Sequence, residues 1–224
     1  MTEGTALVRA EQVVRTMAET AVANETYFCE LDAVVGDGDF GYSLARGFEK
    51  LLEEWERMDY ADVGGFLKKT AMILTSRIGG TSGPIWGTAF LRAGVALTPI
   101  TEPGGEDVVG ALRAAIEGIA ARGKASVGDK TLLDALVPAT DRLEQELAVT
   151  DDPVAILAAT ATTAREAAEA TKNLVARRGR ASYAGERSLG SPDAGAVAVA
   201  VMLEAIAASW TTNDPDPSLL KEEM

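Results

Sequence analysis

The stretch Leu44-Ala-Arg-Gly-Phe48-Glu-Lys-Leu51-Leu-Glu-Glu-Trp55-Glu-Arg-Met58 decides the fold class of this chain. Its apolar residues recur at steps of four, three, four and three, from Leu44 through Phe48, Leu51 and Trp55 to Met58. This spacing puts them on one face of an α-helix and leaves the charged residues on the other face. The stretch therefore predicts an amphipathic helix that buries one face in a core.

Helical spacing recurs along most of the chain. The further apolar stripes run over Val108–Ile119, Leu133–Leu147 and Val199–Trp210, and weaker ones over Leu7–Ala21, Val63–Ile78, Pro84–Leu97 and Val154–Val175. No stretch alternates polar and apolar residues as a half-buried strand does. The sequence therefore predicts an all-α fold of about eight helices.

Three breaks separate the predicted helices. They lie at Asp59–Gly65, Thr98–Gly105 and Thr150–Pro153. In the third break, Asp151 or Asp152 stands before Pro153, which predicts an N-cap followed by proline at the first helical position.

The length of 224 residues, 47% of them hydrophobic, suits one domain with its own core. We expect a single all-α domain over residues 1–210 and a loosely ordered tail over 211–224, where two prolines lie. No apolar run approaches the ~20 residues of a membrane span, and no signal-peptide pattern opens the sequence. We therefore expect a soluble, cytoplasmic protein with no membrane partner.

The chain contains no histidine and one cysteine, Cys29, and its net charge is −13. These counts exclude Ser-His-Asp and Cys-His catalysis within the chain, and also a disulfide framework. The negative charge argues against binding of nucleic acid. Any metal must bind to oxygen ligands, which favours Mg²⁺, Ca²⁺ or Mn²⁺.

The segment Asp32-Ala-Val-Val-Gly36-Asp37-Gly38-Asp39-Phe-Gly41 concentrates carboxylates and glycines. A tight loop can turn Asp37 and Asp39 toward one point, and Asp32 can join them from the preceding turn. Three oxygen ligands with open positions are what Mg²⁺ on a nucleotide needs. The alternative is a solvated Asp-Gly turn, which is a common turn pair.

A second segment, Gly79-Gly80-Thr81-Ser82-Gly-Pro84, has small and hydroxyl residues before a proline that would open a helix. Free backbone N–H groups at such a helix start bind phosphate. The segment is not a Walker A loop, because no Gly-Lys-Ser/Thr follows it. The alternative is a plain Gly-rich connection between helices.

Two more segments do not read as regular helix. Arg122–Thr131 is most simply a helix–helix loop in which Asp129 caps the following helix. Arg177–Arg187 holds four arginines, whose planar groups suit phosphate oxygens. A helix C-terminus with cations against its dipole is the alternative, and it explains Arg180 and Arg187 poorly because both follow Gly179.

Taken together, these motifs resemble the nucleotide-binding L subunits of dihydroxyacetone kinases. The resemblance rests on Leu31–Asp39, Gly79–Pro84, Gly123–Ala125, Gly128–Thr131 with Asp134–Leu136, Gly179–Tyr183 and Gly185–Ser188, which run in the family's order over nearly the whole chain. It implies a closed barrel of eight antiparallel helices with the nucleotide at one end. It also implies an apolar cavity between the helices, which is lipid-filled in some members.

The resemblance also implies roles for individual residues. Asp32, Asp37 and Asp39 would hold two Mg²⁺ ions. The guanidinium of Arg180 would stabilise the negative charge that develops during phosphoryl transfer. Contacts to ADP or ATP would come from Phe40, Gly41, Tyr42, Ser43, Gly80, Thr81, Ser82, Gly123, Leu132, Arg180, Asp193, Ala194 and Gly195. The family usually has histidine where Phe40 stands and Asp-Pro-Gly where Asp193-Ala-Gly195 stands, so Phe40 removes a polar group that faces phosphate.

The implied activity is transfer of a phosphoryl group to a ketose that a separate K subunit holds covalently through a histidine. The donor is either exchanging ATP or a permanently bound ADP, which a phosphocarrier protein of the sugar phosphotransferase system recharges. A nucleotide-binding regulatory or adaptor module, inactive by itself, is the alternative function. A helical lipid-binding protein fits less well, because an apolar pocket needs no Mg²⁺ ligands. The sequence does not determine the oligomeric state, and a homodimer is compatible with it.

Overall fold

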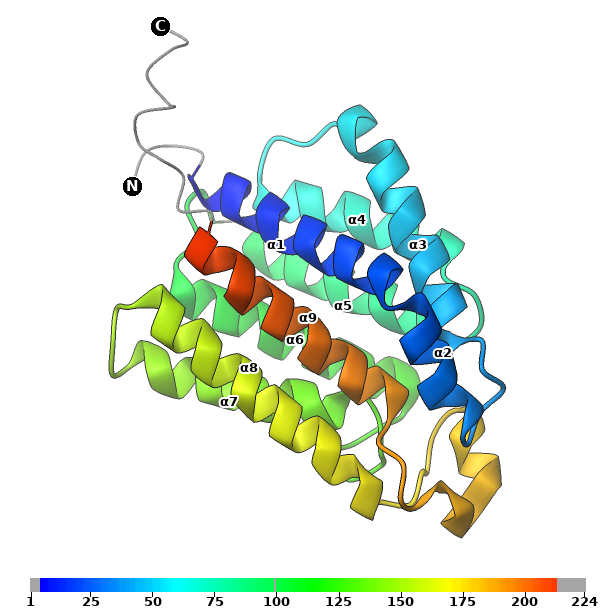
Figure 1. Ribbon diagram of the computed structural model, residues 1–224. Coiled ribbons are helices and arrows are strands. Elements are labelled where there is room, and N and C mark those ends of the chain that lie inside the picture. The colour runs from blue at the N-terminus through cyan, green and yellow to red at the C-terminus, as the bar shows by residue number, and fades with distance from the viewer. Residues whose placement is uncertain (1–4, 99, 213–224) are drawn as a thin grey trace, which may run out of the picture.

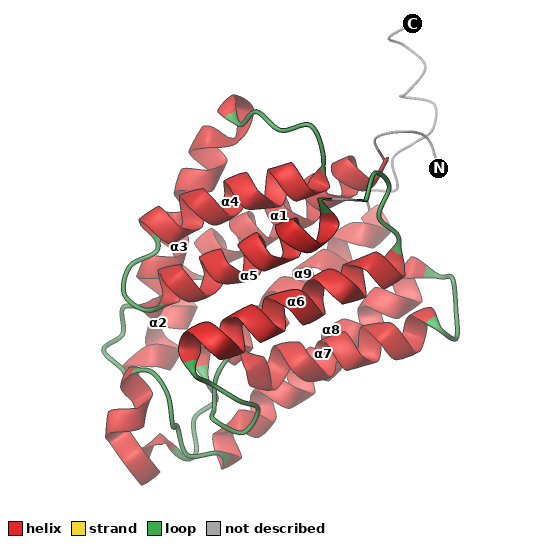
Figure 2. Cartoon of the chain, turned by 180° about the vertical axis from the view of Figure 1, so that it is seen from behind, coloured by secondary structure: helices red, strands yellow, loops and turns green. Residues whose placement is uncertain are grey.

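The computed structural model describes residues 5–98 and 100–212, without the side chains of 211 and 212. All regular structure in these residues is helical (Figures 1 and 2). The α-helices are α1 (Thr5–Ala23), α2 (Glu25–Ala33), α3 (Phe40–Glu54), α4 (Val63–Arg77), α5 (Ser82–Leu97), α6 (Gly105–Gly123), α7 (Leu133–Leu147), α8 (Pro153–Ala170) and α9 (Ala194–Thr212). Short 3₁₀ helices are η1 (Trp55–Arg57), η2 (Thr171–Asn173) and η3 (Arg180–Ser188).

Eight of these helices form a closed ring. Each of α3 to α8 packs against the α-helix that follows it in the chain, α1 packs against α3, and α9 returns to pack against α1. Neighbouring members of the ring run in opposite directions, as Figure 1 shows for α1 and α9. The ring is therefore the closed antiparallel barrel that the resemblance implies. The remaining α-helix, α2, is not a member of the ring and packs on α3 and α9 at one end of the barrel.

The core follows from the stripe that opened the sequence analysis. Leu44, Phe48 and Leu51 of α3 are fully buried. Phe48 meets Trp86 of α5 edge to face, with ring centroids 6.2 Å apart. Such aromatic pairs stabilise a core beyond the area that they bury. The amphipathic pattern of α3 thus faces the barrel interior, as predicted.

The punctuation of the sequence is also confirmed. Asp152 caps α8 by accepting a hydrogen bond from the amide of Val154, and Pro153 occupies the first turn. The three predicted breaks coincide with the connections α3–α4, α5–α6 and α7–α8. The helix α9 extends to Thr212, and the rest of the predicted tail, residues 213–224, lies outside the described residues. Within the described part, no helix combines the length and the apolar character that a membrane crossing requires.

Candidate functional site

Four connections share one end of the barrel. Because the helices alternate in direction, the connections α2–α3, α4–α5, α6–α7 and α8–α9 all lie at the same end, and the others lie at the opposite end (Figure 2). These four connections are the four segments that the sequence singled out. Antiparallel topology alone therefore gathers the aspartates, the Gly/Ser/Thr loop and the arginines.

Asp32 organises the aspartate loop. It lies in the last turn of α2, and its Oδ2 accepts hydrogen bonds from the amides of Gly38 at 2.9 Å and Phe40 at 3.4 Å. Gly38 has a positive φ of 75°, which glycine adopts without strain. A Cβ on Gly36 would lie 2.3 Å from the Asp32 carboxylate. The glycines thus let the backbone wrap around this carboxylate.

This wrapping brings three carboxylates together. One oxygen from each of Asp32, Asp37 and Asp39 lies within 4.8 Å of the other two. Arg180 of η3 pairs with both Asp37 and Asp39, at 3.1 Å from the latter. Hard oxygen donors at this spacing, half-buried or exposed beside a cavity, fit Mg²⁺. The predicted metal ligands are therefore adjacent in space.

The Gly/Ser/Thr loop lies next to this cluster. Gly80 has a positive φ of 62°, and a Cβ there would meet no protein atom within 4 Å. A Cβ on Gly79 would lie 3.1 Å from the hydroxyl oxygen of Ser43, so the loop lies close to the start of α3. The helix α5 begins at Ser82, and the amides of its first turn have no partner within the helix. This arrangement offers backbone donors to an anion in the adjoining cavity.

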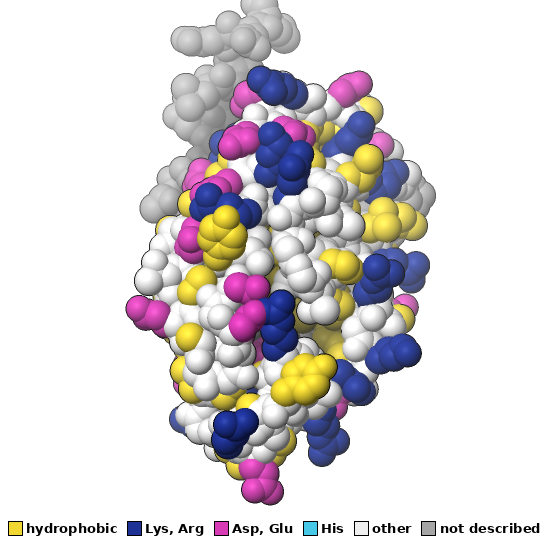
Figure 3. Space-filling view, turned by 90° about the vertical axis from the view of Figure 1, so that its right-hand side faces the viewer, with side chains coloured by type: hydrophobic (Ala, Val, Ile, Leu, Met, Phe, Trp, Pro, Cys, Tyr) yellow, Lys and Arg dark blue, Asp and Glu magenta, His cyan; other side chains and the backbone are white. Residues whose placement is uncertain are grey.

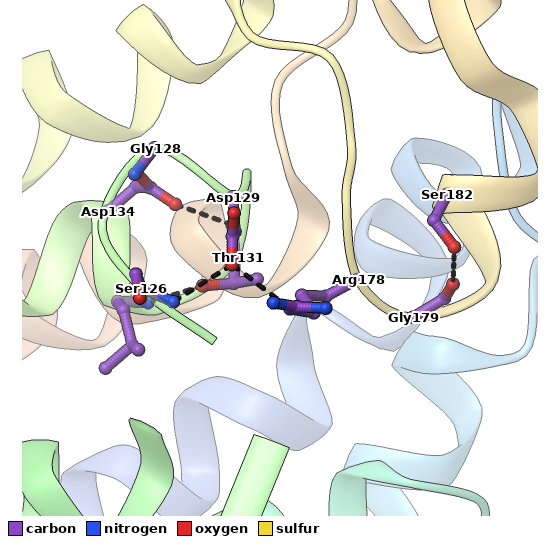
Figure 4. A network of polar contacts seen from close by, with 9 residues as sticks. Ser126, Gly128, Asp129, Thr131, Asp134, Arg178, Gly179 and Ser182 are labelled. Atoms are coloured by element: carbon purple, nitrogen blue, oxygen red, sulfur yellow. Dashed lines mark hydrogen bonds and ion pairs between the residues drawn. The ribbon is translucent and has the colours of Figure 1, made fainter. Parts of the chain in front are cut away.

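The α6–α7 connection holds itself together through two aspartates (Figure 4). The carboxylate of Asp134 accepts hydrogen bonds from the amides of Gly128 and Thr131. The carboxylate of Asp129 accepts one from the amide of Ser126 at 3.0 Å. The prediction that Asp129 caps the next helix is therefore wrong. Its side chain folds back into its own loop, and the N-cap position of α7 is Leu132.

Residues 174–191, which we call the basic segment, connect η2 to α9 and contain η3. Arg178 of this segment reaches across to Asp129, with Nε 3.1 Å from Oδ2 (Figure 4). The amide of Arg177 donates to the carbonyl of Asp129 at 3.0 Å. Figure 3 shows acidic and basic side chains side by side on the face that carries α2 and η3. The basic segment is thus fixed against both the α6–α7 loop and the aspartate loop.

Two ionisable groups, the buried Lys130 and the half-buried Asp193, lie in the wall between these loops. Burial lowers the pKa of Lys130, which is 2% exposed, and the charge of Asp193 opposes this effect. Burial raises the pKa of Asp193 to about 7, and the charge of Asp134 adds to the rise. Bonds from backbone amides and the charge of Lys130 pull that pKa the other way. Asp193 also accepts a hydrogen bond from the amide of Ala196, which caps α9.

All four loops line one cavity of about 520 Å³, a volume typical of small-molecule sites. The predicted site residues that line it are Asp32, Asp37, Asp39, Phe40, Ser43, Gly80, Thr81, Ser82, Gly123, Leu132, Arg180, Asp193, Ala194 and Gly195. Two predicted contacts lie outside this lining. Gly41 packs on α2, where a Cβ would meet the carbonyl of Glu25, and the ring of Tyr42 is exposed beneath Arg46.

Sequence reasoning missed part of the lining. The apolar wall includes Ile85, Trp86 and Ile119, and it suits a flat apolar group such as a nucleotide base. These residues lie in or beside apolar stripes of helical spacing, which predict core positions. Periodicity alone therefore does not identify them as part of a binding site. Phe40 adds to the apolar surface and lies against Phe28, with ring centroids 6.2 Å apart. The cavity lining thus combines charged residues, among them the three aspartates and Arg180, with apolar ones.

The DAK2 domain family matches residues 34–208. The chain belongs to the DAK2 domain family. It is 42% identical over 185 residues to the ADP-binding subunit DhaL of the PEP-dependent dihydroxyacetone kinase of Escherichia coli strain K12. That match covers 81% of this chain and 86% of the relative.

Other relatives of this DAK2 domain are longer proteins. The L-erythrulose 1-kinase of Mycolicibacterium smegmatis is 34% identical over 199 residues, which cover 87% of this chain and 34% of that protein. The crystal structure of the dihydroxyacetone kinase of C. freundii in complex with AMP-PNP and Mg²⁺ superposes with a TM-score of 0.74 at 27% identity. The superposition covers 93% of this chain, which spans 35% of that kinase chain.

Proposed function

We propose that this DAK2 domain is the nucleotide-binding subunit of a dihydroxyacetone kinase. It would bind ADP or ATP with two Mg²⁺ ions and transfer a phosphoryl group to a ketose held covalently on a separate K-type subunit. The observation that carries the proposal is the cluster of Asp32, Asp37 and Asp39 at a cavity that also presents the Gly80–Ser82 backbone. The names of the relatives that this chain matches over most of their length, which are ADP-binding subunits of dihydroxyacetone kinases, support it. A cytoplasmic location is part of the same proposal.

The residues of the cavity suit the separate tasks of phosphoryl transfer. The three aspartates would hold Mg²⁺, which when bound neutralises phosphate charge. The backbone amides of the α4–α5 loop and the guanidinium of Arg180 would hold the transferring phosphate, because charge-assisted donors are strong. The apolar residues of the lining, Ile85, Trp86 and Ile119, would contact the base. Such a reaction needs positioning and charge neutralisation more than covalent chemistry from the protein.

The names of several relatives support one donor scheme. The E. coli and Listeria subunits are called PEP-dependent and ADP-binding, and the Lactococcus lactis subunit is called PTS-dependent. We propose that this chain likewise retains ADP, which a phosphocarrier protein of the sugar phosphotransferase system recharges. Mass spectrometry of the desalted native protein tests this scheme. ADP that remains bound supports it, whereas protein free of nucleotide favours exchanging ATP.

Calorimetric titration with Mg-ADP tests the proposed site. We expect Asp37→Ala to weaken binding by about a hundredfold or more, since a lost metal ligand should exceed the 10–100-fold cost of a lost outer partner. Asp151→Ala removes an exposed carboxylate at the opposite end of the barrel and should bind as the wild type does. Unchanged affinity in Asp37→Ala would remove this residue from the metal site. Absence of binding by nucleotide-stripped wild type would reject the proposed function itself.

A further inference from the structure

Lys130 is the most buried cation of the site, and its ammonium binds backbone only. Its Nζ donates to the carbonyls of Leu174 at 3.2 Å, Ser191 at 2.7 Å, and Ser188. The three N–H groups of the ammonium thus meet three acceptors. Its backbone has a positive φ of 62°, which is uncommon for a residue with a side chain. This strained position aims the side chain into the fold.

All three acceptors belong to the basic segment. Leu174 lies at its start, and Ser188 and Ser191 lie near its end, so one side chain holds both ends. The preceding residue, Asp129, holds Arg177 and Arg178 of the same segment. The excursion between these anchors contains η3, which begins at Arg180. The α6–α7 loop therefore clamps the base of the structure that carries Arg180.

A buried charge is costly, and an apolar side chain of similar length would fill the same space. Burial lowers the pKa of Lys130, which shows the direction of this cost. The three carbonyls would be left without a donor if the lysine were replaced by methionine. Between the anchored ends of the basic segment, Arg180 contacts Asp37 and Asp39, the proposed metal ligands. The same short segment therefore connects Lys130 with the proposed phosphate-binding residues.

We propose that Lys130 is a positioning residue of the nucleotide site. By holding both ends of the basic segment, it sets where Arg180 lies relative to Asp37, Asp39 and a bound phosphate. The part that concerns phosphate rests on the proposed function, whereas the anchoring of the segment does not. Lys130 also lines the cavity, but backbone carbonyls occupy its ammonium donors, so it acts through Arg180 and not by contact with the phosphate.

A double-mutant cycle for Mg-ADP binding separates this role from direct contact. We expect Lys130→Met to raise Kd about tenfold or more, because a misplaced Arg180 would lose its charge-assisted hydrogen bonds to the phosphate. Arg180→Ala should also raise Kd, and the double variant should bind like Arg180→Ala alone, since coupled residues are not additive. Additive losses would overturn the proposal. Lys172→Met removes an exposed lysine just before the segment and should bind normally.

Limited trypsin digestion of the nucleotide-free protein tests the anchoring independently. We expect cleavage at Arg177, Arg178, Arg180 or Arg187 to be at least about tenfold faster in Lys130→Met than in wild type or Lys172→Met, because local opening controls proteolysis. Circular dichroism should show an unchanged helical signal. If Lys130→Met does not fold, Lys130→Gln, which keeps two donors, carries both experiments.

The two experiments also distinguish the proposals. Equal cleavage rates in wild type and a folded Lys130 variant would overturn the positioning role, whether or not nucleotide binds. If wild type binds no Mg-ADP but the variant is cleaved faster, the anchoring stands and the proposed function fails.

Discussion

Gly80 shows how a single position can serve the backbone and the ligand together. Its φ of 62° disfavours any side chain, and the space around its missing Cβ contains no protein atom within 4 Å. A side chain there would point into open space beside the cavity lining rather than into the core. The steric demand for glycine thus comes from the backbone conformation and from whatever fills the cavity.

We therefore expect Gly80→Val to weaken Mg-ADP binding about tenfold or more, because a β-branched side chain strains the loop and blocks close approach to phosphate. Ser82→Ala should have a smaller effect, since the backbone amides remain. Gly80→Ala is the matched control, because it carries the strain of a side chain at the same φ of 62° but adds only a methyl group beside the cavity. Equal losses of affinity in Gly80→Ala and Gly80→Val would mean that strain alone explains the effect. Calorimetry supplies the comparison.

Asp193 makes the stability of the nucleotide-free protein depend on pH. Its pKa is raised to about 7 in the folded state, from an ordinary value near 3.8, chiefly by burial. The folded state therefore binds more protons than the unfolded state between these values. The stability from protonated Asp193 is complete below about pH 4 and is lost as the pH rises through 7.

Replacing Asp193 by Asn removes this titration and keeps an oxygen that can accept the Ala196 amide bond. We expect the free energy of unfolding of the wild type to fall more steeply between pH 4 and 7.5 than that of Asp193→Asn, by on the order of a few kcal/mol over that range. Urea unfolding at several pH values measures the difference. Parallel curves for the two proteins would show that Asp193 ionises normally.

Proximity in space could be predicted for residues that lie close together in sequence. Asp32, Asp37 and Asp39 stand close together in one glycine-rich segment, so their meeting in space could be expected. Lys130 could not be identified in this way, because a lysine in a polar loop looks exposed until the carbonyls of residues 174–191 are placed around it. Asp129 was misassigned for the same reason, since its partner Arg178 is distant in sequence.

At the scale of elements, the pair α4 and α5 is built on close approach. A Cβ on Gly64 would lie 2.7 Å from the carbonyl oxygen of Gly94 and from the backbone of Thr98. These atoms belong to backbone and cannot rotate away. By contrast, Gly110 on the exposed side of α6 has nothing within 4 Å of its missing Cβ.

We expect opposite outcomes from one substitution type in these two helices. Gly64→Ala should lower stability by about 1–3 kcal/mol through overpacking. Gly110→Ala should raise it by roughly 0.4–1 kcal/mol, because alanine restricts the unfolded chain and favours helix. Thermal unfolding should show Tm shifts of opposite sign. A destabilised Gly110→Ala, or an unaffected Gly64→Ala, would contradict this account of the packing.

The eight apolar stripes of the sequence correspond to the eight helices of the ring, because each buries one face in a common core. The ninth helix, α2, was not predicted. It buries only Phe28, and Tyr27 is exposed, so no stripe forms over its short length. The sequence predicts a loop where the 3₁₀ helix η3 lies, because Gly179 precedes this element and Gly185 interrupts it, both with positive φ. Elements that cap the barrel carry weaker periodicity than those that build it.

At the scale of the whole molecule, the topology separates scaffold from site. The alternating helix directions place the described glycines of positive φ, together with the charged residues of the candidate site, in connections at one end of the barrel. Ligands recur at loops positioned by a rigid scaffold for this reason. A phosphate at Asp37 and Arg180 would lie near the protein surface, because both side chains are about half exposed. Such a position allows a second protein to reach it.

Partner dependence follows from the same arrangement. We expect the purified chain with ATP and Mg²⁺ to show no phosphorylation of dihydroxyacetone, because it has no histidine to hold the ketose covalently. A ketose that arrives by diffusion forfeits the proximity effect, which can supply roughly 7–11 kcal/mol of a barrier. Adding a K-type subunit, with the phosphocarrier system where ADP is retained, should produce activity.

Two variants make this experiment decisive. Asp39→Asn should remain inactive with the K-type subunit, since it removes a proposed metal ligand beside the exposed phosphate position. Asp151→Ala, at the far end of the barrel, should be activated as fully as wild type. Phosphorylation of dihydroxyacetone by the chain alone would require a ketose site within the barrel. Mg-ADP binding without activity, with a matching K-type subunit and phosphate donor present, would instead identify a nucleotide-dependent adaptor. In either case the K-type subunit should dock over Asp37, Asp39 and Arg180, because these half-exposed side chains bring the proposed phosphate position to the protein surface.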